Sequence, residues 1–258
     1  MHRVTWAGND PARGRRPNFD PAHKLMKTLL RIVLGLGTAA SPVIAAEATA
    51  TAAWKAGAAV IDITPEGPVW MAGYGARKKP SEGVSQKLYA KALALEDSAG
   101  SRLVAVTLDL IGVPRAVREG VERQVGERHG LRPEALLLNA SHTHSGPSPY
   151  ARGVPDPAYL DKAESYGRTL QEKIVQVVGA ALKQSAPASL HYTRARAAFA
   201  MNRRLRVGTE IRNSPNPEGP VDHDVPVLRV NGADGKLKAI LFGYACHNTV
   251  TGFYTING

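Results

Sequence analysis

The segment Ala135-Leu-Leu-Leu-Asn-Ala-Ser-His-Thr-His-Ser-Gly-Pro147 places an apolar run directly before two histidines, His142 and His144. The apolar residues predict a buried strand, and Gly146 and Pro147 predict the loop that follows it. Side chains at positions i and i+2 of an extended chain leave the same face. We therefore expect a strand that delivers both imidazoles to one point, which is the geometry of a metal site.

The segments on either side of this strand predict helices. Val117, Val121 and Val125 recur every four residues between Pro114 and Gly130, which indicates an amphipathic helix that ends at the glycine. A second helix is expected over about 157–183, where apolar residues again gather on one side.

Strand-like segments make up most of the remaining chain: 58–64, 88–95, 102–110, 188–195, 225–230 and 238–246. Turn residues at 97–100 and 231–235 predict two hairpins. Strands that alternate with helices and include hairpins predict an α/β fold, with a mixed β-sheet and flanking helices in a single domain. The last strand is expected to lead into His247, so two strand ends carry histidines where open α/β sheets bind ligands.

The N-terminal region predicts export to the periplasm or the exterior. Residues 26–46 have the basic start, short apolar centre and small-residue end of a secretory signal peptide, with cleavage after Ala45 or Ala46. The apolar centre is shorter than the roughly 20 residues of a membrane span, so we expect no transmembrane helix in the mature chain. Residues 1–25 are interpreted as a disordered leader or a misassigned start, and residues 47–55 as a linker.

The composition fits a globular protein with a core, since 43% of the 258 residues are hydrophobic. The net charge of +11 is not evenly spread, because residues 1–46 carry 7 basic and 2 acidic side chains. The rest carries 26 basic and 20 acidic side chains, a net charge of +6 that argues against a nucleic-acid partner. The single cysteine, Cys246, excludes an intramolecular disulfide.

A basic cluster remains in the mature region: Arg194, Arg196, Arg203, Arg204, Arg206 and Arg212. Such a cluster can bind nucleic acid, anionic lipid headgroups or an anionic substrate, and it can also be a solvated face. The sequence alone leaves these alternatives open.

Three histidines, His142, His144 and His247, form the candidate metal site. A neutral imidazole nitrogen donates a lone pair without bringing charge into a buried site, which suits zinc. Two motifs contain these histidines, 141–147 and 244–249. Five further motifs occur elsewhere in the chain: 59–65, 71–74, 107–109, 201–203 and 221–224. With these motifs, the chain from Ala56 to Gly258 resembles the neutral (alkaline, non-lysosomal) ceramidases, which are secreted or surface zinc amidases that split ceramide into sphingosine and a fatty acid.

The resemblance implies roles for four residues. His142 and His247 would be ligands of Zn²⁺, and His144 and Arg203 would be catalytic residues, with His144 contacting the substrate amide or its oxyanion. A guanidinium at Arg203 can stabilise charge that develops on a carbonyl oxygen. The implied partner is a ceramide-like lipid amide, with peripheral contact to a membrane surface.

Three carboxylates are further candidates: Asp109, Asp222 and Asp224. Each can orient a histidine by accepting a hydrogen bond from its ring, and each can instead cap a loop.

The chain departs from the family in length. The family enzymes are far longer, and their glutamate and tyrosine zinc ligands and active-site serine lie beyond the equivalent of Gly258. Two histidines do not complete a catalytic zinc site, which usually has three protein ligands and an open position. We therefore expect a truncated, N-terminal part of a catalytic domain. The alternatives are a non-catalytic exported module that binds lipid or anions and has a vestigial metal site, or a related hydrolase of a different amide or ester.

Overall fold

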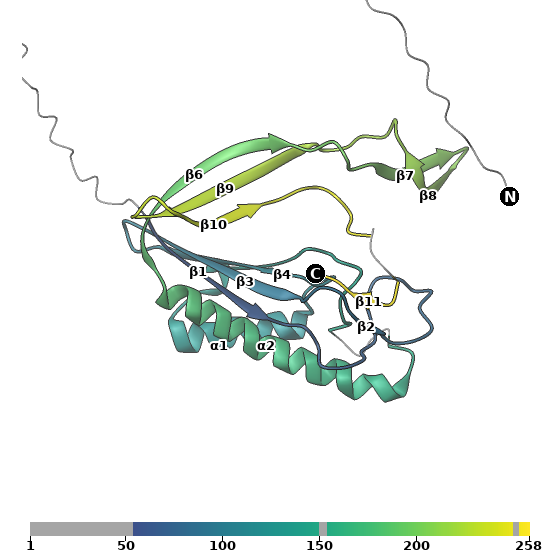
Figure 1. Ribbon diagram of the computed structural model, residues 1–258, viewed down its shortest axis with the longest axis horizontal. Coiled ribbons are helices and arrows are strands. Elements are labelled where there is room, and N and C mark those ends of the chain that lie inside the picture. Colours follow the sequence, from purple (N-terminus) through teal and green to yellow (C-terminus); the bar gives the residue numbers. More distant parts are fainter. Residues whose placement is uncertain (1–53, 150–153, 250–252) are drawn as a thin grey trace, which may run out of the picture. The chain divides into compact units, whose positions relative to one another are not determined.

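The computed structural model describes residues 54–149, 154–249 and 253–258 (Figure 1). The predicted leader and signal peptide, and the linker up to residue 53, lie outside the described residues. The main sheet consists of β1 (Trp54–Asp62), β3 (Tyr89–Asp97), β4 (Arg102–Leu108), β5 (Leu136–Ala140), β6 (Ala186–Arg196), β9 (Asp224–Gly232) and β10 (Leu237–Phe242). The α-helices are α1 (Arg115–His129) and α2 (Leu160–Lys183), and short 3₁₀ helices lie at Pro133–Ala135 and Pro157–Tyr159.

The seven strands lie in the order β10-β9-β6-β1-β3-β4-β5. All neighbouring pairs are antiparallel except β4 and β5, which are parallel. A parallel pair needs a crossover, and α1 supplies it between these two strands. The predicted mixed α/β sheet with flanking helices is confirmed, and the parallel pair brings the carboxyl ends of β4 and β5 to one edge.

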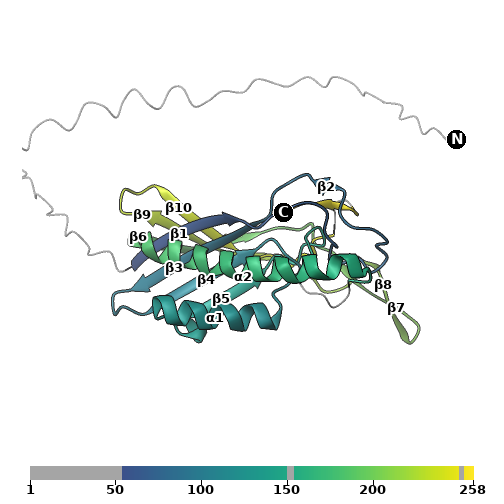
Figure 2. The same ribbon diagram turned by 90° about the horizontal axis from the view of Figure 1, so that it is seen from below.

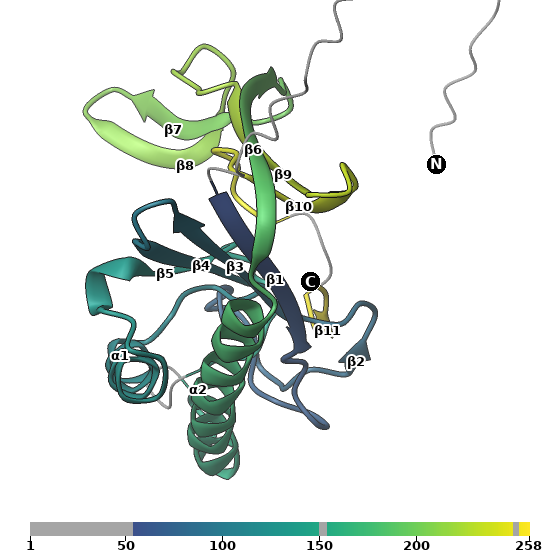
Figure 3. The ribbon, with the colours of Figure 1, turned by 90° about the vertical axis from the view of Figure 1, so that its left-hand side faces the viewer.

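Both helices lie on the same face of the β1-β3-β4 part of the sheet, as Figure 2 and Figure 3 show. The side chains of β3 show which face of the sheet the helices cover. Its Ala90, Ala92 and Ala94 belong to the large core cluster with α1 and α2, whereas Leu93 belongs to a smaller cluster on the other side. The alternation follows from the period of two residues in a strand. Small alanines in β3 allow the helices to approach the sheet closely.

The smaller cluster joins the two halves of the sheet. Ala56 of β1 and Leu93 of β3 pack with Ala188 of β6 and Val230 of β9, all at most 6% exposed. These four residues lie on the consecutive strands β9, β6, β1 and β3, and β1 and β6 pair over only three residues. The arch of β6, β9 and β10 above β1 and β3 is visible in Figure 1.

Helix α1 follows the sequence prediction closely. Val121 and Val125 are fully buried, and the helix ends at Gly130, whose φ of 60° is left-handed. The backbone N–H of Gly130 donates to the carbonyl of Gly126, which closes the last turn. Because glycine tolerates positive φ, the chain can leave the helix here and enter β5.

Several boundaries differ from the predictions. Strand β1 begins at Trp54 and ends at Asp62, because its whole length pairs with β3. Strand β10 ends at Phe242, so the prediction that a strand runs directly into His247 is wrong. Pairing with β9 stops at Phe242, and the following residues form a loop although they are apolar.

Two small sheets were not predicted. Strands β7 (Asn202–Val207) and β8 (Glu210–Asn216) form an antiparallel hairpin, and β2 (Gly83–Val84) pairs in parallel with β11 (Thr255–Ile256). Their arginine-rich or very short sequences lack the apolar alternation on which strand predictions depend. The β2–β11 pair brings the C-terminal residues next to the segment after β1.

Candidate metal centre

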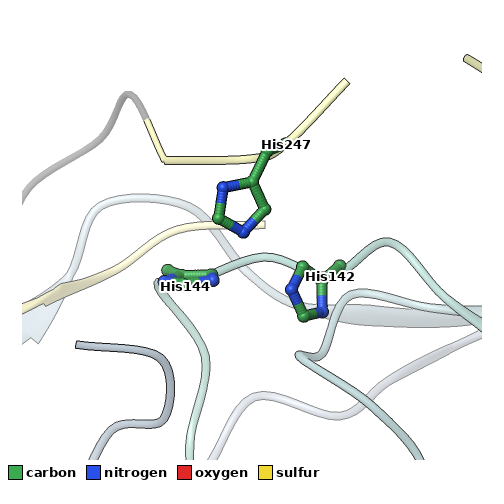
Figure 4. Close-up of side chains that lie close together, drawn as sticks. All are labelled: His142, His144 and His247. Atoms are coloured by element: carbon green, nitrogen blue, oxygen red, sulfur yellow. The ribbon is translucent and has the colours of Figure 1, made fainter. Parts of the chain in front are cut away.

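Three histidines from two segments meet beside the carboxyl end of β5. His142 and His144 lie in the loop after β5, and His247 lies in the segment after β10; Figure 4 shows the three rings facing one another. The ring centroids are 5.2 Å apart for His142 and His144, 5.1 Å for His142 and His247, and 4.6 Å for His144 and His247. One ring nitrogen of each lies within 4.8 Å of the others. The structure thus brings together the three histidines that the sequence singled out.

The ligand nitrogens lie farther apart than they would around a bound zinc ion. In tetrahedral coordination, two nitrogens that each lie about 2.1 Å from one zinc ion are about 3.4 Å apart. The nitrogens here lie within 4.8 Å of one another, so metal binding requires the rings to move closer. His142 is exposed and His247 is partly exposed, so rotation about their side-chain torsions is the available movement.

A loop, and not a strand, presents His142 and His144. Strand β5 ends at Ala140, and His142 has φ = 61°, which a residue of an extended strand does not adopt. The prediction that alternation along a strand aligns the two rings is therefore wrong in its mechanism. His142 Nδ1 is 2.8 Å from the carbonyl oxygen of Ile111, so Nδ1 carries the proton and Nε2 is left for a metal.

His144 is the buried member of the group. It is 9% exposed, and neither of its ring nitrogens has a hydrogen-bond partner in the described residues. The same holds for Nε2 of His247. Buried polar atoms are nearly always paired, because an unpaired one loses its hydration without compensation. A metal ion would supply the missing partner of Nε2 of His247, and a substrate amide would supply one for His144, so these residues fit the zinc that the resemblance implies.

The surroundings of His144 and His247 favour their neutral forms by lowering the pKa of each. Burial, with the neighbouring His247 and His142, lowers the pKa of His144 to about 4. Burial and the charge of Arg203 also lower the pKa of His247. Neutral imidazoles have a lone pair available, so protons do not compete strongly with a metal near pH 7.

Two hydrogen bonds connect the loop that carries His142 and His144 to the segment that carries His247. The N–H of His144 donates to the carbonyl of Asn248 at 3.3 Å, and the side-chain amide of Asn248 donates to the carbonyl of Ser141 at 2.6 Å. Since Asn248 directly follows His247, these contacts set the distance between the two loops. The sequence signal for Asn248 was only its place in the motif 244–249.

Arg203 lies at the same site. It lines a cleft of about 720 Å³ together with His144, His247 and Tyr74. Its positive charge is one of the causes that lower the pKa of His144 and of His247. The cleft therefore combines imidazoles, a guanidinium and the aromatic ring of Tyr74, a set that can bind a polar group attached to an apolar chain.

The structure places the three candidate carboxylates in other contacts. Asp109 accepts a hydrogen bond from the N–H of Tyr89 at 2.9 Å and pairs with Lys91 at 3.2 Å. These contacts join β3 to the end of β4.

Asp222 accepts from the backbone N–H of Asp224 at 2.9 Å, as in an Asx turn. Asp224 itself pairs with Arg196 at 3.2 Å and with Arg194 at 3.9 Å. The carboxylates thus order loops and strand ends near the site.

Comparisons with known proteins assign the family. A model of the N-terminal region of neutral/alkaline non-lysosomal ceramidases matches residues 54–254. The chain belongs to this family. The neutral ceramidase of Pseudomonas aeruginosa is 27% identical over 203 residues, which span 76% of this chain and 30% of that protein.

Solved structures give the same assignment. The crystal structure of neutral ceramidase from Pseudomonas aeruginosa matches with a TM-score of 0.66 at 25% identity, covering 79% of this chain and 34% of that one. A structure of a ceramidase complexed with C2 matches with a TM-score of 0.61 at 25% identity, covering 75% of this chain and 31% of that one. This chain of the ceramidase family thus spans about a third of the length of these relatives.

Proposed function

We propose that this chain carries the zinc-binding part of an amide hydrolase that cleaves N-acylsphingosine into sphingosine and a fatty acid. The observation that carries the proposal is the convergence of His142, His144 and His247, whose buried nitrogens lack partners, on a cleft that Arg203 also lines. Membership of the ceramidase family supports the hydrolytic class and an amide substrate with lipid chains.

The residues have distinct roles in this proposal. His142 and His247 hold the zinc, and the ring of His142 is oriented by its contact with the carbonyl of Ile111. Bound zinc supplies a Lewis acid for the amide carbonyl and lowers the pKa of a water molecule towards about 7. His144, neutral and in the same cleft, is placed to hydrogen-bond the amide, and Arg203 stabilises negative charge on the carbonyl oxygen.

Hydrolysis assays test the proposal. In an enzyme of the length of the relatives that carries this segment, we expect release of fatty acid from N-acylsphingosine when zinc is supplied, and none in its His247→Ala variant. His191→Ala is the matched control, because His191 is exposed on β6. Wild-type activity in His247→Ala would contradict the proposed role of this histidine. Cleavage of a matched ester but not of the amide would favour the related hydrolase.

A second function, binding to an anionic lipid surface, is favoured by one observation on β7. Arg203 and Arg206 are exposed and have no ion pair in the described part of the chain. The guanidinium of Arg204 donates to Asn213 and to the carbonyl of Arg203, and it has no carboxylate partner there either. Arg203 belongs to the cleft, so lipid bound to this strand would lie beside the candidate metal centre. We propose that the arginines of β7 contact the membrane that holds the substrate, or, in a non-catalytic module, are themselves the functional site.

Vesicle sedimentation separates these possibilities. We expect binding to vesicles with anionic lipid, weakened by salt and by the double change Arg204→Gln with Arg206→Gln. The control is Arg115→Gln with Arg118→Gln, two arginines paired with glutamates on α1. Vesicle binding with weak zinc binding and no hydrolysis would favour the non-catalytic module. If both double variants bound the anionic vesicles equally well, the proposed role of the β7 arginines in lipid binding would be wrong.

We also propose that the chain is exported after cleavage of residues 26–46. The support is the sequence pattern of a signal peptide. Among the described residues, neither helix is long and apolar enough to cross a membrane. N-terminal sequencing should show that the exported protein begins at Ala46 or Glu47. An exported protein that still carried residues 1–25 would contradict the predicted cleavage.

A further inference from the structure

Arg77 is a buried cation beside the candidate metal centre. It is 3% exposed, and the described residues place no carboxylate within ion-pair distance of it. Its guanidinium donates instead to three backbone carbonyls. Nε donates to Phe253 at 2.6 Å, Nη2 to His144 at 2.7 Å, and Nη1 to Ala72.

The three carbonyls belong to three segments that are far apart in the sequence. Ala72 lies in the glycine-rich segment after β1, His144 lies in the loop after β5, and Phe253 lies just before β11. The guanidinium also lies against two aromatic rings, 4.8 Å from the centroid of Tyr74 and 5.5 Å from that of Phe253. These two rings stack at 5.0 Å. One side chain therefore joins the segment that carries His144 to two others.

Burying a cation is costly unless its hydrogen bonds are satisfied. The pKa of Arg77 is lowered by this burial, which shows that the environment disfavours the charge. Three carbonyl dipoles and two ring faces compensate for the lost hydration. A lysine at this position cannot make the same three hydrogen bonds. Its three donors share one nitrogen, whereas the arginine donors point in three directions within one plane.

We propose that Arg77 is a positioning residue for the metal centre: it fixes the backbone of His144, and through it the ring that faces His142 and His247. The contact is at the carbonyl of His144 itself, so a shift of this carbonyl rotates the attached side chain. The inference rests on the proposed metal site for its functional meaning, but the restraint on the loop is a property of the metal-free chain.

Hydrogen–deuterium exchange of the metal-free protein tests the restraint. In Arg77→Lys we expect at least about tenfold faster exchange in peptides that cover 141–148 and 253–258, and wild-type rates in β3 and β4. Arg115→Lys is the control, because Arg115 is exposed on α1 and contacts only Glu119 there. Unchanged exchange in the two segments would overturn the proposal. Loss of protection throughout the sheet would overturn it too, since Arg77 would then hold the whole fold.

Metal binding provides the second measurement. The loop that Arg77 holds at His144 also carries the proposed ligand His142, and loss of a group that orients a ligand typically lowers metal affinity by about 10–100-fold. We expect a fall of that size in Arg77→Ala, with recovery when ethylguanidinium is added and none with ethylammonium. Wild-type affinity in Arg77→Ala would contradict the positioning role while leaving the metal site intact. If wild-type protein bound no zinc, the proposed function would fail, and the exchange experiment would still decide whether Arg77 restrains the loop.

Discussion

Gly73 and His144 are in such close contact that no other residue fits at position 73. A Cβ atom at Gly73 would lie 2.5 Å from Cγ of the His144 ring, and the φ of Gly73 is 104°. Both facts require glycine, because real Cβ atoms do not approach that closely and L-residues rarely adopt this φ. Tyr74, the next residue, places its ring 4.9 Å from that of His144. The glycine-rich segment therefore forms one wall of the candidate metal centre.

Gly73→Ala should displace the His144 ring, which lies against the proposed ligands His142 and His247, and through them lower zinc affinity by about tenfold or more. The strained φ should also cost about 1–3 kcal/mol of stability. Gly75→Ala is the control, because a Cβ there meets nothing within 4 Å. Zinc titration and urea unfolding of both variants check the prediction, and equal zinc affinities would mean that the ring does not need this wall.

The metal-free protein should lose stability as the pH falls from about 6.5 to 4. The pKa of His144 is about 4 in the folded chain and near 6.5 when exposed, so only the unfolded state takes up a proton in this window. Proton uptake by the unfolded state favours unfolding. In His144→Gln this contribution is absent, and the urea midpoint measured in chelator at pH 7 and pH 5 should fall less than in the wild type. An equal fall in both proteins would count against the buried, neutral imidazole.

In an enzyme of the length of the relatives that carries this segment, Arg203→Ala should lower kcat for N-acylsphingosine about 10²–10³-fold, as the loss of an oxyanion donor does in other hydrolases. Zinc content should remain unchanged, because Arg203 is not a proposed ligand. Arg212→Ala serves as the control on the same hairpin, where Arg212 pairs with Glu210. A large rise in KM with unchanged kcat would instead assign Arg203 to substrate binding.

The core prediction concerns two leucines. Leu170 of α2 is 0% exposed, whereas Leu137 of β5 is 54% exposed. Leu170→Ala should lower the free energy of unfolding by about 2–5 kcal/mol, because it leaves a cavity between helix and sheet. Leu137→Ala should change it by less than about 0.5 kcal/mol. Urea unfolding curves of both variants distinguish a packed helix–sheet layer from a loose one.

The fold was predictable where local patterns and packing agree. Val117, Val121 and Val125 gave the α1 helix its period, and Gly130 ended it. The turn after Asp97 gave the β3–β4 hairpin. By contrast, the β7–β8 hairpin carries four exposed arginines, and its strands pair without burying any of their residues. The end of β10 depends on where β9 stops pairing, which no local pattern records.

The site was predictable in its residues but not in its geometry. His142, His144 and His247 were visible as histidines after apolar runs, yet a left-handed φ at His142 and the contact of Asn248 with Ser141 bring them together. The burial of Arg77 could not be predicted from the sequence, because a buried arginine has the same local sequence pattern as a surface one. Only the folded chain brings the carbonyls of three separate segments around it. Such contacts depend on tertiary structure alone.

Direct measurement of zinc binding tests the central claim that His142 and His247, beside His144, form a metal centre. The wild-type protein should bind one zinc ion in a competition titration, with imidazole nitrogens at about 2.0–2.1 Å in X-ray absorption. His142→Ala and His247→Ala should each lose this binding, and His191→Ala should keep it. Absence of zinc binding in the wild type, or wild-type affinity in a protein that lacks both His142 and His247, would contradict the account.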